Sequence, residues 1–385
     1  MASQIYLPID PSTRQTRLIN INPSANHSAT IECYLHTISV DHPPQYKALS
    51  YVWGNVNDFM QIRLNGEAFD VGVNLWHAIR RLRHQDKPEV FWIDAICINQ
   101  NDIPERNAQV LIMGDIYEQA EEVVIWLGEE ADDSSLAFEL IRMWGRAGHL
   151  FFGSGDRVST ESEEAGTLLD NVSTRAFEPR CSLALLRLLI RPYWRRIWVL
   201  QEVARARTRT LVCGNDRLDI SPLFAANSFW EKIDDPAFAD LVKGADGFIY
   251  DAIIKLNTIR AFWHASHEVD TPVSIILYRT REFFATDPRD KIYGLLGLPA
   301  LKSLHVKPDY SLTVEEVYTQ FSHAVFDQLG QLAPFASVNG TLEITWQNFE
   351  DGVPENRQGF IDAILSQAAG SGRGREEEEV VAELA

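Results

Sequence analysis

Short apolar runs alternate with helix-like periods through the first half of the chain. The segments 46–52 (YKALSYV), 90–98 (VFWIDAICI) and 123–127 (VVIWL) are apolar almost throughout, which is typical of strands buried on both faces of a parallel sheet. A further strand is predicted over 208–213. Between the first two strands, residues 74–83 repeat apolar side chains at spacings of three and four, which predicts a helix. This order of strands and helices predicts an α/β fold.

Turn and cap residues mark the ends of these elements. Asn65 and Gly66 lie between alternating apolar positions and predict a hairpin, because a type I′ turn needs two residues that tolerate positive φ. Asp102 is the expected N-cap of the helix that follows it. Helical patterns return over 182–189 and over 193–206.

The second half of the chain is predicted to be mostly helical. Helix-like periods recur at 223–233, 248–264, 274–284, 288–296 and 314–329. The expected organisation is a strand-containing lead-in at 1–45, an α/β domain at 46–215 with a polar insertion at about 150–180, a helical region at 216–330, and a short segment with an acidic, disordered tail at 331–385.

The charge balance limits the expected partners. The chain has 35 Lys and Arg against 54 Asp and Glu, a net charge of −19, and this field repels phosphate backbones and anionic lipids. Nucleic acid is therefore not expected as a partner. The N-terminus lacks a signal-peptide pattern and the most apolar stretch is short, so we expect a cytoplasmic protein without a membrane span.

Several kinds of chemistry are absent from the sequence. Its four cysteines form no C-x-x-C pair and have no histidine spacing for zinc, so we expect reduced core thiols and no metal. No Gly-Lys pair occurs, which excludes a P-loop. The sequence also lacks a dinucleotide-binding glycine fingerprint and the G-x-S-x-G and H-E-x-x-H motifs. No bound cofactor is expected.

Four segments are unusually dense in Trp, Gly and charge: 50–54 (SYVWG), 92–100 (WIDAICINQ), 117–128 (YEQAEEVVIWLG) and 191–202 (RPYWRRIWVLQE). Together with DPRDKIYGLLGL and PDYSLTVEEVY downstream, they resemble the fungal heterokaryon-incompatibility (HET) domain family. The resemblance covers residue 46 to about 215, and the downstream motifs extend it to about 321. It implies a cytosolic response to non-self, with programmed cell death when genetically different hyphae fuse.

The HET domain in turn resembles a distant variant of Toll/interleukin receptor-type (TIR) domains, whose sheet is flavodoxin-like. SYVWG would correspond to the first strand and its loop, and WVLQEV to a helix that carries a W-x-x-x-E motif. Trp198 and Glu202 match that motif. In TIR enzymes the glutamate is the catalytic residue that cleaves NAD at its nicotinamide bond. The resemblance therefore implies Glu202 as a catalytic residue and NAD as a substrate.

The chemistry of NAD is compatible with a single carboxylate. Its leaving group is already a pyridinium and departs neutral, whereas an ordinary glycoside uses two carboxylates. Stabilising the positive charge that develops on the ribose can be worth roughly 3 to 4 kcal/mol. If 193–206 is one helix, Trp194, Trp198 and Glu202 share a face.

Candidate binding residues lie in two regions. Ser50, Tyr51, Trp53, Gly54 and Asp94 are expected near strand ends, where open α/β sheets bind ligands. Seven arginines but only one acid lie between positions 187 and 209, and arginine suits bidentate phosphate contacts. We therefore expect Arg195 and Arg196 to bind a diphosphate, beside Trp198.

Each of these assignments has a structural alternative. Glu202 could pair with Arg205 on a solvated helix, and the tryptophans could belong to the core. The arginines could pair with the acidic segment 129–133, Asp94 could accept a structural hydrogen bond, and Gly54 could only permit a tight turn.

Two classes of function stay open on the sequence. In the first, the domain hydrolyses NAD when it assembles as a homo-oligomer or with a protein from an incompatibility locus. In the second, it is a non-catalytic signalling adaptor that acts through oligomerisation and partner binding. Family members commonly have longer C-terminal regions, so a truncated family member is a further interpretation.

Overall fold

The computed structural model describes residues 5–10, 13–55, 57–152, 179–230, 248–265 and 271–336. The strands are β1 (Gln15–Ile21), β2 (Glu32–Ser39), β3 (Lys47–Ser50), β4 (Phe59–Leu64), β5 (Glu67–Gly72), β6 (Glu89–Trp92), β7 (Glu122–Trp126), β8 (Arg209–Cys213) and β9 (Asp216–Asp219). Within the described residues they form one sheet of nine strands, in the order β5-β4-β2-β1-β6-β3-β7-β8-β9.

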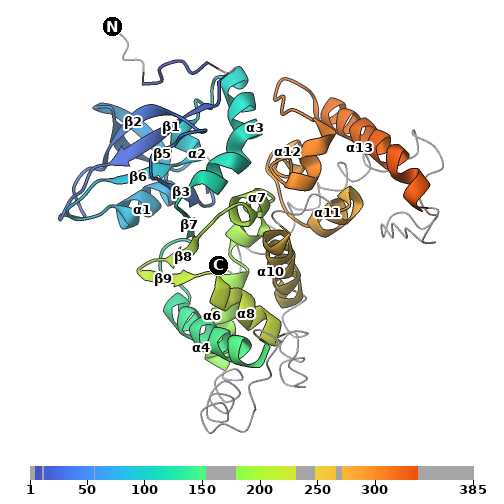
Figure 1. Cartoon of the computed structure of the whole chain (residues 1–385). Coiled ribbons are helices and arrows are strands. Elements are labelled where there is room, and N and C mark those ends of the chain that lie inside the picture. The colour runs from blue at the N-terminus through green and yellow to red at the C-terminus, as the bar shows by residue number, and fades with distance from the viewer. Residues whose placement is uncertain are drawn as a thin grey trace.

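Helices flank this sheet, and the elements described after β9 are all helices. The helices of the structure are α1 (Val73–Leu82), α2 (Asp94–Cys97), α3 (Ile103–Gln119), α4 (Ser134–Phe152), α6 (Pro179–Leu189), η1 (Pro192–Arg195), α7 (Val199–Ala204), α8 (Ser221–Trp230), α10 (Phe248–His264), α11 (Val273–Thr280), α12 (Asp290–Tyr293), η2 (Pro299–Leu304) and α13 (Val314–Ala336). In Figure 1, α4, α6 and α8 gather beside β8 and β9, whereas α11, α12 and α13 form a separate group near α7.

The parallel part of the sheet confirms the predicted α/β class. Strands β6, β3, β7 and β8 are parallel neighbours in this order across the sheet. When these four strands are numbered 1 to 4 in chain order, starting from β3, their order across the sheet is 2-1-3-4. This is the order of flavodoxin-like sheets, in which ligands bind beside the first strand at the carboxyl ends. The complete sheet is mixed, because β1, β2 and the hairpins add antiparallel pairs.

The N-terminal segment is an integral part of the sheet, since β1 lies between β2 and β6. Arg17 of β1 is only 2% exposed and pairs with Glu105 of α3, with 2.6 Å between Nη1 and Oε1. Trp92 of β6 donates through its indole N–H to Thr16, at 3.0 Å. These contacts join the predicted lead-in to the α/β core.

Local sequence signals predicted the turn and the cap correctly. Asn65 and Gly66 connect β4 to β5 with φ of 54° and 85°, the left-handed values that a type I′ hairpin requires. Asp102 accepts a hydrogen bond from the backbone N–H of Glu105 at 3.0 Å and caps α3.

The strand predicted over 90–98 is wrong beyond Trp92. The chain turns at Ile93 and forms the short helix α2, in which the N–H of Cys97 donates to the carbonyl of Ile93 at 2.7 Å. A continuous apolar run does not by itself separate a buried strand from a buried helix. Asp94 therefore begins a helix at the carboxyl end of β6 and does not lie inside a strand.

The single helix predicted over 193–206 is also wrong. Arg196 is extended, with ψ of 132°, and it forms an isolated parallel bridge with Phe284. The N–H of Ile197 donates to the carbonyl of Phe284 at 2.8 Å. This pairing separates η1 from α7, so Trp194 and Glu202 do not share a helix face.

The structure also bears on the predictions made for the cysteines and for a membrane span, whereas most of the predicted insertion and tail is not described. All four cysteines are buried and free. No helix in the described ranges is long and apolar enough to cross a membrane. Residues 153–178 of the predicted insertion and 337–385 of the predicted tail lie outside the described residues. Helix α4, which the sequence interpretation missed, covers the chain just before that insertion.

Candidate functional site

A buried polar cluster lies at the carboxyl end of β3. Glu202 of α7 is 2% exposed and accepts two hydrogen bonds from Arg196, at 3.1 and 3.2 Å. The hydroxyl of Ser50 also donates to the Glu202 carboxylate. Tyr193 lies 2.7 Å from the Ser50 oxygen, and because Ser50 has a single proton, Tyr193 is the donor in this pair.

Electrostatics keep Arg196 and Tyr193 of this cluster in fixed charge states. Burial opposes the charge on Arg196, but Glu202 and then Asp94 hold its pKa above the ordinary value. Burial, and then the charge of Glu202, raise the pKa of Tyr193. Arg196 therefore stays cationic and Tyr193 stays a protonated donor at physiological pH.

Asp94 and Trp53 form the solvent-facing side of the cluster. The indole N–H of Trp53 donates to Asp94 at 2.8 Å, and the backbone N–H of Ala95 donates to the other carboxylate oxygen at 2.7 Å. Burial, and then the charge of Glu202, raise the pKa of Asp94 to about 6. Trp53 is 45% exposed and Asp94 is half-buried, so this edge presents an aromatic ring to solvent with a carboxylate beside it.

Most of the predicted binding residues occur together here. Tyr51 is 2% exposed, and burial and then the charge of Asp94 raise its pKa. Gly54 ends the loop with φ of 80°, which agrees with the tight-turn alternative. Trp198 is directed elsewhere, because its indole N–H donates to Asp290 at 3.2 Å. Arg195 is the last residue of η1, and its backbone carbonyl accepts a hydrogen bond from the N–H of Phe284.

Two of the structural alternatives can be decided. Glu202 does not pair with Arg205, which instead donates to Glu118 on α3, so the solvated-helix interpretation is wrong. Trp194 is 1% exposed, and its indole N–H donates to the carbonyl of Leu188 at 3.0 Å. The core interpretation is correct for this tryptophan.

The arginine-rich segment does not form a single anion patch. Arg187 lies 3.5 Å from Asp132, and Arg191 donates to the carbonyls of Leu127 and Glu129, at 2.7 and 3.2 Å. Arg187 therefore pairs with the acidic segment, as the structural alternative proposed, whereas Arg191 bonds to backbone carbonyls. Arg196 is the arginine of this segment that reaches the Glu202 cluster.

The downstream motif packs against the helix that carries Glu202. A side chain on Gly297 would overlap the amide oxygen of Gln201, and a Cβ on Gly294 would lie 3.0 Å from Ile197. Asp290 accepts from Trp198 and, at 2.6 Å, from the hydroxyl of Tyr310. The glycine spacing in DPRDKIYGLLGL was the available signal of this close approach.

The cluster combines two carboxylates, one arginine and an exposed indole beside the first parallel strand. An indole can stack on a planar ring, an arginine can bind phosphate, and a carboxylate can stabilise a developing positive charge. No group of three or more metal-ligating side chains occurs among the described residues. The arrangement therefore has the chemical groups that an anionic ligand with an aromatic ring would require.

Comparison with known proteins places these residues in a family. The family model for heterokaryon incompatibility protein (HET) matches residues 46–202, a range that ends at Glu202. Heterokaryon incompatibility protein 6, OR allele, of Neurospora crassa is 28% identical over 364 residues, which cover 83% of this chain and 52% of the relative. The chain thus spans about half the length of this curated relative. No solved structure matches the chain. The matched range shows that residues 46–202 resemble the heterokaryon incompatibility (HET) domain, and the wider similarity to the Neurospora protein extends beyond that domain.

Proposed function

We propose that this protein is a cytoplasmic effector in heterokaryon incompatibility, which causes cell death after contact with non-self. The proposal is supported by the family match over residues 46–202 and by the similarity to the Neurospora heterokaryon incompatibility protein. Its partner is a second copy of the chain or a protein from an incompatibility locus.

The proposed activity is hydrolysis of NAD at the nicotinamide glycosidic bond. The observation that carries it is the pair of carboxylates, Glu202 and Asp94, beside the exposed ring of Trp53. The nicotinamide ring stacks on Trp53. The substrate diphosphate draws Arg196 away from Glu202, and this exchange uncovers the carboxylate for the ribose.

The reaction needs no general acid. The bond between the anomeric carbon and the pyridinium nitrogen breaks, and its electron pair leaves with neutral nicotinamide. Glu202 stabilises the positive charge left on the ribose. Water then bonds to the anomeric carbon and gives its proton to Asp94, whose pKa of about 6 suits a base at neutral pH. The second product is ADP-ribose.

Nicotinamide release from NAD by concentrated, purified protein tests this activity. Glu202→Gln and Asp94→Asn should each slow release at least about a hundredfold, whereas Arg279→Gln on the exposed surface of α11 should leave it unchanged. Far-UV circular dichroism checks that each variant is folded. Absence of turnover by the wild-type chain, alone or crosslinked into oligomers, would remove the enzymatic proposal.

A second proposal is a non-catalytic signalling adaptor, and one observation favours it. Within the described residues, Arg196 and Ser50 donate the hydrogen bonds to the Glu202 carboxylate, and the residue is 2% exposed, which also suits a structural ion pair. If the protein is an adaptor, folded Glu202→Gln should still kill fungal cells in which it is expressed. If the protein is an enzyme, this variant should not kill them.

A further inference from the structure

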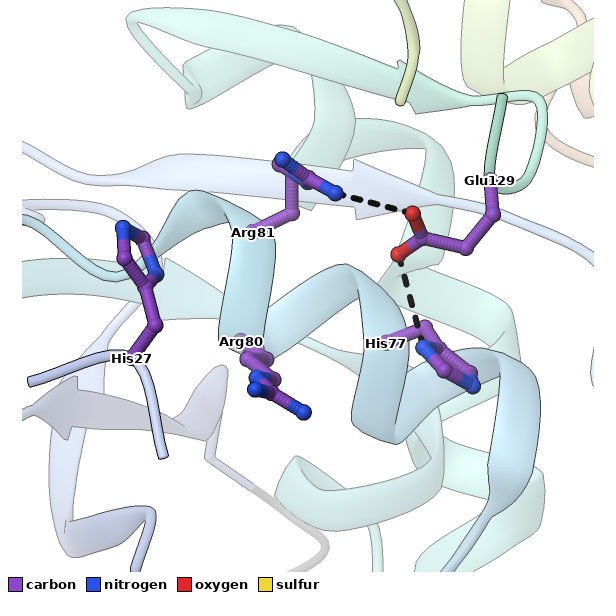
Figure 2. Close-up of a pocket in the computed structure, with 5 residues that line it drawn as sticks. All are labelled: His27, His77, Arg80, Arg81 and Glu129. Carbon is purple, nitrogen blue, oxygen red and sulfur yellow. Dashed lines mark hydrogen bonds and ion pairs between the residues drawn. The ribbon is translucent and has the colours of Figure 1, made fainter. Parts of the chain in front are cut away.

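A hollow lined by polar side chains lies on α1 and shares no residue with the Glu202 cluster. It has a volume of about 430 Å³ and is lined by His27, His77, Arg80, Arg81 and Glu129. Figure 2 shows three of these side chains on α1, with Glu129 and His27 contributed by neighbouring loops. Its volume lies within the range of roughly 300 to 1,000 Å³ that is usual for small-molecule sites.

Among the described residues, Glu129 is the one acid that lines the hollow, and its charge is already neutralised. One carboxylate oxygen of Glu129 is 2.9 Å from Arg81, and the other is 3.4 Å from Nδ1 of His77 (Figure 2). Arg81 also donates to the side chain of Asn215 in the turn between β8 and β9. These contacts fix Arg81 in place and remove the charge that would repel an anion.

Arg80 is the cation that remains available. In the described part of the chain it has no ion-pair partner, and its guanidinium lies over the ring of Trp76, 4.9 Å from the centroid. His77 packs edge-on against the same ring, with centroids 5.2 Å apart. The indole therefore orients Arg80 through a cation–π contact, which leaves the edge of the guanidinium free to donate hydrogen bonds.

The charge of the hollow selects the class of ligand. Two guanidinium groups, two imidazoles and one carboxylate line the hollow. The hollow is therefore rich in basic groups, although the chain as a whole has a net charge of −19. Arginine matches the geometry of phosphate oxygens, and the volume exceeds what a bare phosphate ion fills. We propose that the hollow on α1 binds a small organic phosphate, with Arg80 as its principal ligand and His27 closing the opposite side.

A purely structural role for these arginines makes a different prediction. Arg80 and Arg81 lie in the last turn of α1, where cations stabilise the negative end of the helix dipole. That role alone requires no ligand. Binding measurements therefore separate the two interpretations.

Isothermal titration of the full chain with ribose 5-phosphate tests the proposal, with inorganic phosphate and uncharged ribose as companion probes. Ribose 5-phosphate should bind and ribose should not. Arg80→Gln should weaken binding at least about tenfold, and His77→Gln should weaken it less. Arg279→Gln makes the same charge change on α11, and its affinity should be that of the wild type.

Two results would overturn the site. One is the absence of any binding of ribose 5-phosphate or phosphate at millimolar concentration. The other is a folded Arg80→Gln variant with wild-type affinity, which would assign the binding to another surface. Glu202→Gln should bind ribose 5-phosphate normally, so failure of this site is distinguishable from failure of the proposed NAD activity.

Discussion

Replacing Arg196 by methionine tests how strongly the buried ion pair stabilises the fold. The change removes both charge-assisted hydrogen bonds to Glu202, whose side chain is 2% exposed, while that of Arg196 is 15% exposed. Glu202 would keep only the Ser50 hydroxyl as a donor. Because removal of one partner leaves an uncompensated buried charge, the expected loss is about 3 to 5 kcal/mol in the free energy of unfolding.

Urea unfolding, followed by tryptophan fluorescence and circular dichroism, measures this loss. Arg187→Met is the matched control, because its pair with Asp132 is 42% and 46% exposed and should contribute no more than about 1 kcal/mol. Adding Glu202→Gln to Arg196→Met should recover part of the stability, since the stranded charge is then gone. Equal, small losses for Arg196→Met and Arg187→Met would refute the reasoning.

Two further predictions concern the surroundings of the cluster. The pKa of Asp94 is raised from 3.8 to about 6, so the folded state holds this proton more tightly than the unfolded state. The contribution of Asp94 to stability therefore falls as the pH rises from about 4 to about 6. Asp94→Asn should flatten the dependence of the urea midpoint on pH over this range. An unchanged slope would contradict this. Gly297→Ala should cost about 1 to 3 kcal/mol of folding stability through overlap with Gln201. Thermal unfolding should show that adding Gln201→Ala restores part of the loss, and no rescue would contradict the packing argument.

Elements fixed by local sequence could be predicted. The strand at Val123, the hairpin at Asn65 and Gly66, and the cap at Asp102 each depend on residues within a few positions. Burial on both faces, left-handed φ and side-chain capping are local requirements. These predictions therefore agree with the structure.

Features that depend on distant partners could not be predicted. The break before α7 is caused by pairing between Arg196 and Phe284. Glu202 meets Ser50 across 152 positions of the chain, and this contact replaces the Arg205 pair that helical spacing suggested. The glycines of the downstream motif indicated close packing against another segment. Their local sequence did not indicate that this segment is α7.

NAD hydrolysis at the Glu202 cluster is tested by the rate of nicotinamide release from NAD by oligomeric wild-type protein and by folded Asp94→Asn. Asp94 is chosen because it lies at the partly exposed edge of the cluster, so its replacement disturbs the fold less than a change at Glu202. The account predicts measurable release by the wild type and a loss of at least about a hundredfold in the variant. Equal rates for the two proteins would contradict it.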